Sequence, residues 1–177
     1  MKITLLSAIL CFISFSIKAQ TTFPQAWVGT WKGQLEILST NTKQPKQEPI
    51  NVILEIMPIK GSKAYTWKTT YTTATGPLVK DYKLVPDSIE GRYKIDEGDA
   101  ILLDNYWLGN KLFCCFEVEN MLFYCTYELQ GDKLVFEIVF GPAKPINSTG
   151  NTVIATDTIP EVKSYAFSGL QRAVLAR

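Results

Sequence analysis

Residues 101–140 read ILLDNYWLGNKLFCCFEVENMLFYCTYELQGDKLVFEIVF. This stretch contains three residue pairs that favour tight turns, namely Gly109-Asn110, Glu119-Asn120 and Gly131-Asp132. A two-residue hairpin loop fixes which residues lie opposite each other, so the loops pair Leu108 with Lys111, Val118 with Met121, and Gln130 with Lys133. We therefore predict four consecutive antiparallel strands joined by hairpins.

The three registers agree on a single apolar face. The residues on this face are Ile101, Leu103, Asn105, Trp107, Leu112, Cys114, Phe116, Val118, Met121, Phe123, Cys125, Tyr127, Leu129, Leu134, Phe136, Ile138 and Phe140. The opposite face carries the charged and polar residues Asp104, Lys111, Glu117, Thr126, Glu128, Lys133 and Glu137. One apolar and one solvated face are typical of an antiparallel sheet that covers a core on one side.

The rest of the chain continues the pattern of short strands. Runs rich in β-branched and aromatic residues predict strands near 27–38, 49–59, 64–73, 79–85, 88–95, 151–157 and 162–175. A three-residue loop at 97–99 would place Ile89, Gly91, Tyr93 and Ile95 inside. The long connections are 40–48 and 141–150, each with proline.

These strands predict an all-β fold. Sequential strands joined mostly by hairpins favour an up-and-down antiparallel β-barrel of about 8–10 strands, because closure removes exposed edges. A two-sheet β-sandwich is the alternative, although it usually needs longer crossing connections.

The first 19 residues resemble a secretory signal peptide. A basic start at Lys2 is followed by an apolar run, and Ala19 is a small residue suited to cleavage. The expected mature chain, 20–177, is a single barrel domain without a transmembrane segment, secreted or periplasmic. A membrane anchor is the alternative, but the run is only about 15 residues where a span needs roughly 20.

Composition excludes several classes of function. With 18 basic and 17 acidic residues, a net charge of +1 argues against a nucleic-acid partner. The chain has no histidine, the commonest general base and a usual metal ligand. No phosphate loop, nucleophile motif or carboxylate cluster at metal spacing is present. We therefore nominate no catalytic residue, metal site or cofactor, and an enzyme is the less favoured interpretation.

The segment Trp27-Val28-Gly29-Thr30-Trp31-Lys32-Gly33 resembles the Gly-x-Trp opening of the lipocalin and fatty-acid-binding families, within the calycin superfamily. The resemblance implies that Gly29 and Trp31 close one end of the barrel. It also implies that an arginine near the last strand packs on the Trp31 ring, for which Arg172 is the candidate. The segment 43–47 is too short and polar for the helical lid of the fatty-acid-binding group.

The predicted interior is rich in aromatic residues with polar ends. Such side chains suit a partly open cavity, although a small barrel can also be filled by its own side chains. No acid or base faces inward on strands 101–140, so a neutral apolar or aromatic ligand is expected. The candidate ligand-binding residues are Tyr65, Trp67, Tyr71, Tyr93, Asn105, Trp107 and Tyr127.

Three cysteines follow the signal-like segment. The loop at 119–120 places Cys114 opposite Cys125, both inward, with Cys115 outward. This is a hydrogen-bonded pair, in which Cβ atoms lie farther apart than a relaxed disulfide prefers. A Cys114–Cys125 disulfide and two buried thiols both remain open.

Two functional hypotheses follow. The first is a lipocalin-like protein that holds a small neutral apolar or aromatic molecule inside the barrel. The second is a module with a packed core that binds a protein or glycan through outward Tyr106, Phe113 and Tyr124.

Overall fold

The tight turns in 101–140 have the registers that the sequence predicts. In the computed structural model, which describes residues 22–41, 43 and 47–177, the pairs Leu108–Lys111, Val118–Met121 and Gln130–Lys133 flank the three loops. Gly109 and Asn110 both have positive φ, 54° and 71°, as a type I′ hairpin turn requires.

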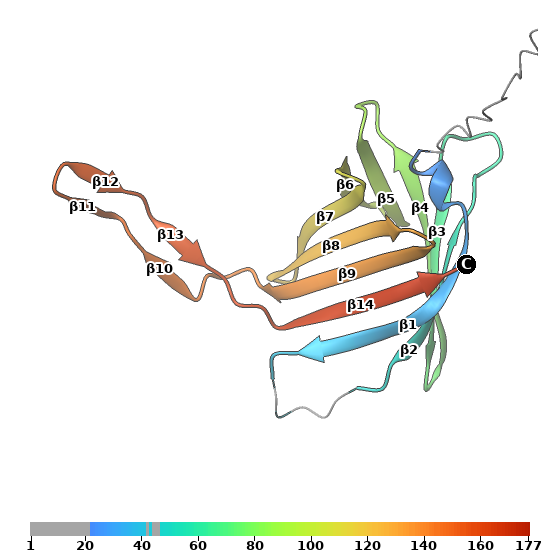
Figure 1. Cartoon of the computed structure of the whole chain (residues 1–177), viewed down its shortest axis with the longest axis horizontal. Coiled ribbons are helices and arrows are strands. Elements are labelled where there is room, and N and C mark those ends of the chain that lie inside the picture. Colours follow the sequence, from blue (N-terminus) through green and yellow to red (C-terminus); the bar gives the residue numbers. More distant parts are fainter. Residues whose placement is uncertain (1–21, 42, 44–46) are drawn as a thin grey trace, which may run out of the picture.

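Ten strands of the described residues close into one antiparallel barrel (Figure 1). They are β1 (Gly29–Ser39), β2 (Ile50–Ile56), β3 (Tyr65–Thr73), β4 (Gly76–Pro86), β5 (Arg92–Gly98), β6 (Ile101–Leu108), β7 (Lys111–Val118), β8 (Met121–Gln130), β9 (Lys133–Pro142) and β14 (Gly169–Ala176). Neighbours in sequence are neighbours in the barrel, and β14 closes it between β9 and β1. The predicted up-and-down barrel is confirmed, and the sandwich alternative is wrong.

One end of the barrel is filled by a segment that precedes the first strand. The 3-10 helix η1 (Gln25–Trp27) and Phe23 lie across this end. Phe23 stacks on Trp107 with ring centroids 4.3 Å apart and meets Trp27 edge-on at 4.7 Å. The segment therefore acts as an aromatic plug.

The strand predicted at 88–95 begins later than expected. Asp87 Oδ1 accepts a hydrogen bond from the Ile89 amide (3.3 Å), and the Arg92 amide donates to Ile89 O (3.1 Å), so this segment turns. Ile89, expected inside, is 51% exposed. Residue 97 belongs to β5 rather than to a loop; the turn lies at 99–100, beyond a β-bulge between Asp96 and Gly98.

Ile101 and Val118 also differ from expectation. Both were placed on the apolar face, but they lie at strand ends and are about half exposed, 48% and 50%. Alternation selects a face of the sheet, whereas depth in the barrel depends on distance from the rim.

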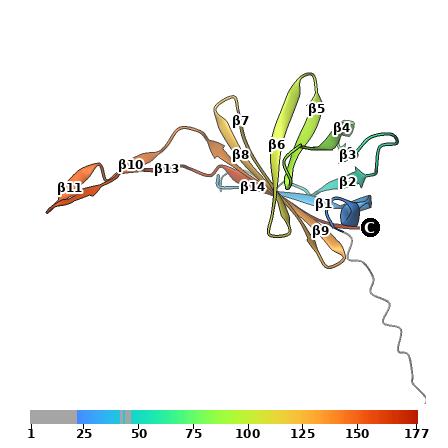
Figure 2. The same cartoon turned by 90° about the horizontal axis from the view of Figure 1, so that it is seen from above.

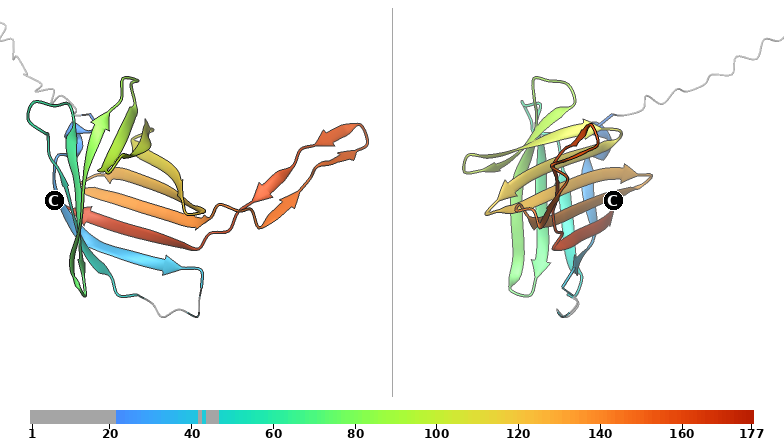
Figure 3. Two further views of the ribbon diagram at one scale, coloured as in Figure 1. Left: turned by 180° about the vertical axis from the view of Figure 1, so that it is seen from behind. Right: turned by 90° about the vertical axis from the view of Figure 1, so that its left-hand side faces the viewer.

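The largest difference from the sequence prediction is an arm between β9 and β14. Four short strands form a ribbon, namely β10 (Asn147–Thr149), β11 (Thr152–Ile154), β12 (Asp157–Ile159) and β13 (Val162–Ser164). β10 pairs with β13 and β11 with β12, and the ribbon projects away from the barrel (Figures 1, 2 and 3). The predicted strand 162–175 is therefore two strands, one in the arm and one in the barrel.

The proposed signal peptide, 1–19, lies outside the described residues. Within the described ranges, no helix is long and apolar enough to span a membrane.

Candidate functional site

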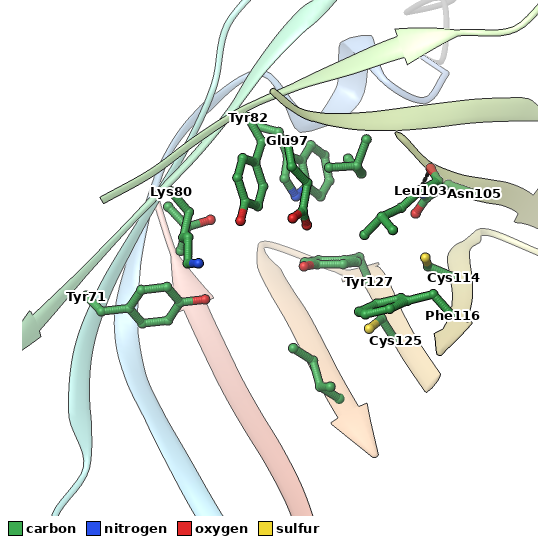
Figure 4. Close-up of a pocket in the computed structure, with 14 residues that line it drawn as sticks. Tyr71, Lys80, Tyr82, Glu97, Leu103, Asn105, Cys114, Phe116, Cys125 and Tyr127 are labelled. Atoms are coloured by element: carbon green, nitrogen blue, oxygen red, sulfur yellow. Dashed lines mark hydrogen bonds between the residues drawn. The ribbon is translucent and has the colours of Figure 1, made fainter. Parts of the chain in front are cut away.

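The candidate site is a cavity inside the barrel, on the far side of its core from the plug. Its volume is about 150 Å³. Alternate residues of β3 to β9 point into it, because successive side chains of a strand face opposite sides of the sheet. Figure 4 shows labelled side chains from these strands converging on one space.

Apolar and aromatic side chains form much of the wall. Leu103, Phe116 and Ile138 contribute apolar surface. The Trp67 and Tyr127 rings meet edge-on, with centroids 5.0 Å apart and an interplanar angle of 80°. Burial raises the pKa of Tyr127 well above its ordinary value, so its hydroxyl stays protonated and can donate a hydrogen bond.

Asn105 is the most deeply buried polar residue of the wall, with 1% of its surface exposed. Its Nδ2 donates to Leu103 O (2.8 Å), a bond that Figure 4 marks with a dashed line. Within the described residues this is the only side-chain hydrogen bond of Asn105. An amide has two N–H donors and an acceptor oxygen, so Asn105 retains capacity to bind a polar group in the cavity.

The open side of the cavity carries polar and charged residues that the sequence analysis missed. Lys80, Tyr82 and Glu97 come from β4 and β5 and point toward the same space as Tyr71 (Figure 4). The Lys80 ammonium lies 5.9 Å from the Tyr82 ring centroid. Burial and then the Glu97 carboxylate raise the pKa of Tyr82, while Lys80 opposes the rise.

The inward residues of 101–140 that line the cavity are neutral, as predicted. The two charges come from Lys80 and Glu97, which that prediction did not cover. Alternation in 80–84 could have indicated that Lys80 and Tyr82 point inward, because they lie on the same face of the strand as the buried Leu84. Placing Glu97 in a loop hid the second charge.

Four of the seven predicted ligand-binding residues line the cavity: Trp67, Tyr71, Asn105 and Tyr127. Burial, and to a lesser extent Tyr82 and Cys125, raise the pKa of Tyr71 to about 12. The Tyr71 hydroxyl is therefore neutral at physiological pH.

The other three predicted residues, Tyr65, Tyr93 and Trp107, lie at the plugged end. Phe23 stacks on Trp107 and meets Tyr93 edge-on at 4.9 Å. The Tyr65 hydroxyl donates to Gln25 Oε1 at 3.2 Å. These residues face inward as predicted, but the plug occupies their end of the barrel.

Cys114 and Cys125 face each other across β7 and β8, as the sequence predicts, and both line the cavity. All three described cysteines are free, and Cys115 is exposed. Burial is the main cause that raises the pKa of both inward thiols to about 12. The pair thus presents two neutral, polarizable groups to the cavity.

Trp31 lies at the plugged end, where the residue is 1% exposed and its Nε1 donates to Trp27 O (2.8 Å). The arginine on this ring is Arg177, not Arg172 as expected, with its guanidinium carbon 4.5 Å from the ring centroid. Arg177 also donates to Ala26 O at 2.6 Å.

Strand alternation explains the correction. Ala173 and Leu175 point inward, so Arg172 points outward and its Nε donates to Glu137 Oε1 at 3.0 Å. Gly29 allows the close approach of Arg177, because a Cβ at this position would lie 3.1 Å from the arginine Nε, and its φ of +152° is one that L side chains rarely adopt.

In the described part of the chain, no three cysteine or carboxylate side chains gather in a metal-binding cluster. Every fully buried side-chain nitrogen or oxygen there has a hydrogen-bond partner. The cavity chemistry is thus that of neutral hydrogen bonding and apolar contact, with one cation and one anion at its open side.

No protein-family model and no curated protein matches the chain. Among solved structures it is similar to a crystal structure of a protein of unknown function from the DUF3598 family of Nostoc punctiforme PCC 73102, with a TM-score of 0.57. The two are 13% identical, and the match covers 85% of this chain and 47% of that one, so this chain spans about half that protein's length. At this identity the likeness concerns the fold alone.

Proposed function

We propose that the protein binds a small molecule of about one ring inside the barrel. The observation that carries this proposal is the cavity of about 150 Å³ on the unplugged side of the core. Apolar cavities of about this volume accept a benzene-sized molecule. Drug-sized ligands occupy pockets of roughly 300–1,000 Å³, so a larger ligand would have to project from the open side.

The lining selects an apolar or aromatic molecule that carries a polar group. Phe116, Leu103 and Ile138 provide apolar contact for a ring, and Asn105 can hydrogen-bond to a substituent. Lys80 and Glu97 have opposite charges and offset each other, which keeps a molecule without net charge the favoured ligand. The protein would act as a carrier or sensor of that molecule.

Two further observations support a lipocalin-like protein. The Trp31 ring is buried at the plugged end, and an arginine packs on it, which suits the end-closing role that the resemblance to the lipocalin opening implies. The signal-like segment 1–19 adds export to the proposal, and a secreted or periplasmic protein could carry its ligand outside the cytoplasm. Purification from the native organism should then give a mature chain that begins at Gln20, and intact mass measures this.

The binding test is native mass spectrometry of the protein purified from its own organism, followed by denaturing extraction and small-molecule analysis. We expect one compound of about one ring per chain. Phenol, titrated by calorimetry, serves as the probe for protein produced in another host. A chain that carries no compound and does not bind phenol at millimolar concentration would overturn the proposal.

A matched pair of variants locates the binding site. Cys125→Phe fills the cavity, whereas Cys115→Phe places the same side chain on the outer face. Binding should be lost in the first variant and kept in the second. Asn105→Leu conserves volume but removes the amide, and it should weaken phenol binding about fivefold or more, as expected for a hydrogen bond of about 1 kcal/mol. Thermal melts check that each variant folds.

A second candidate function is binding of a protein or glycan through the outer face. Tyr106 and Phe113 lie directly opposite each other across β6 and β7, and Arg92 stacks on the Tyr106 ring at 5.6 Å. Aromatic and arginine side chains are enriched at binding hot spots. Alanine replacements at Tyr106, Phe113 and Tyr124 should then abolish retention of cell-envelope components without altering phenol binding.

A further inference from the structure

The arm, residues 143–168, exposes apolar side chains along most of its length. Val153 and Ile154 at its tip are each 63% exposed, and Phe167 at its base is 58% exposed. An isolated two-stranded ribbon is at best marginally stable in water, because it lacks a sheet or helix to cover it. The tip strands β11 and β12 pair only with each other in the described residues.

The base of the arm is firmly attached to the barrel. The Ser168 amide donates to Phe140 O, and the Ala143 amide donates to Asn120 O, both at 2.8 Å. A Cβ at Gly141 would lie only 2.1 Å from Ala166 O, so the two backbones are in close contact there. These contacts hold the arm in its projecting direction (Figure 3).

An apolar hollow of about 550 Å³ lies between the base of the arm and the outer face of β8 and β9. We call it the base hollow; it is lined chiefly by Leu122, Tyr124, Val139, Pro142, Tyr165 and Phe167. Exposed apolar patches rich in aromatic residues mark interaction sites. The arm projects away from the barrel, so its own tip does not cover this hollow (Figures 1 and 2).

We propose that the protein forms a twofold dimer in which the arms of two copies lie antiparallel and each tip enters the base hollow of the other copy. A twofold axis makes the two contacts of such a dimer equivalent. If the tip of one copy reaches the base hollow of its partner, the partner's tip also reaches the base hollow of the first copy. This arrangement covers both the tip and the hollow.

The charges of the arm permit such self-association. Two lysines, Lys144 and Lys163, balance two acidic residues, Asp157 and Glu161, so two arms do not repel each other through net charge. Lys163 and Glu161 are paired at 3.4 Å. A standard interface involves about 20–30 residues a side. The arm, 143–168, spans 26 residues.

Analytical ultracentrifugation of the purified full chain from about 1 to about 100 µM tests the proposal, because mass action drives association. We expect twice the mass of a single chain at the higher concentrations. The double variant Val153→Asp with Ile154→Asp should lower the dimer association constant at least tenfold. Leu108→Asp is the matched control, since Leu108 is 61% exposed on the barrel and away from the arm, and it should remain dimeric.

A cross-link tests the arrangement itself. In a Cys115→Ser background, Val153→Cys at the tip and Ser164→Cys at the base are separated by much of the ribbon within one chain, but approach each other between copies. Mild oxidation should give a covalent dimer that reductant dissociates.

A chain that is monomeric throughout, or a dimer unaffected by the tip variant, would overturn the proposal, as would a monomer whose arm instead captures another protein. None of these outcomes bears on phenol binding in the cavity.

Discussion

Cys114 and Cys115 are adjacent in the chain and lie in opposite environments. Cys114 points into the barrel beside Cys125, whereas Cys115 points outward next to Tyr124. Strand alternation alone produces this difference, because successive residues face opposite sides of a sheet. The chemistry of each thiol follows from its face.

The two inward thiols should resist alkylation. Burial raises the pKa of Cys114 and Cys125 to about 12, so at pH 8 only about one in 10⁴ of each is the reactive thiolate. Iodoacetamide should therefore modify Cys115 first, which peptide mass spectrometry can follow. Equal rates at all three cysteines, or a Cys114–Cys125 disulfide in the purified protein, would contradict this prediction.

A second residue-level prediction concerns the two C-terminal arginines. Arg177 lies over the buried Trp31 ring and donates to Ala26 O, so Arg177→Ala should lower the free energy of unfolding by about 1 kcal/mol. Arg172→Ala removes only an exposed pair with Glu137 and should have a smaller effect. Urea denaturation compares them, and an equal or larger loss for Arg172→Ala would refute the assignment.

At the scale of the element, the plug 22–28 makes the two ends of the barrel different. Its aromatic side chains fill the end at which Tyr65, Tyr93 and Trp107 point inward. The opposite end, where Tyr71, Tyr82 and Glu97 point inward, keeps its cavity. Which inward residues border the cavity thus depends on a segment whose sequence shows neither strand nor helix periodicity.

The plug should contribute strongly to stability. Phe23 contacts the rings of Trp27, Tyr93 and Trp107, and Phe23→Ala should lower the free energy of unfolding by about 3–5 kcal/mol through loss of buried surface and creation of a cavity. Urea denaturation followed by circular dichroism measures this. The control Phe113→Ala removes an outward phenylalanine and should cost far less. Similar losses in both would mean that the plug is not part of the folded core.

At the scale of the whole molecule, the interior contains several groups whose neutral forms the fold stabilises. Cys114, Cys125 and Tyr71 each have a pKa raised to about 12, mainly by burial. In the unfolded chain the two thiols would lose their protons near pH 9 and the tyrosine near pH 10. Above pH 9 the unfolded state therefore binds fewer protons than the folded state.

Stability should thus be retained below pH 9 and lost as the pH rises toward 12. The sign follows from linkage, since alkali favours the state that has released more protons. Thermal melts between about pH 8 and about pH 12 should show a falling midpoint, by about 2–4 °C for each kcal/mol lost. The double variant Cys114→Ala with Cys125→Ala should flatten the decline. A midpoint that is constant over this range would contradict the prediction.

Much of the barrel could be predicted from residues 101–140. The two-residue loops have few conformations, so they specified pairing such as Cys114 with Cys125 and Val118 with Met121. Prediction was weaker at 88–100, where an Asp87 turn and a β-bulge shifted the strand. It was incomplete for the arm, where β11 and β13 are shorter than the strands predicted at 151–157 and 162–175, because short exposed strands lack the apolar alternation that signals a sheet.

The sequence by itself determined the all-β architecture, the order of the hairpins and the inward face of most strands in 101–140, because alternation and tight turns are local properties of the chain. Only the tertiary structure decided which inward residues form a cavity, that Lys80 and Glu97 both line it, and that Arg177 rather than Arg172 covers Trp31. Depth within a barrel and closure of its ends depend on contacts between segments far apart in sequence, such as Phe23 with Trp107. A local pattern cannot specify such contacts.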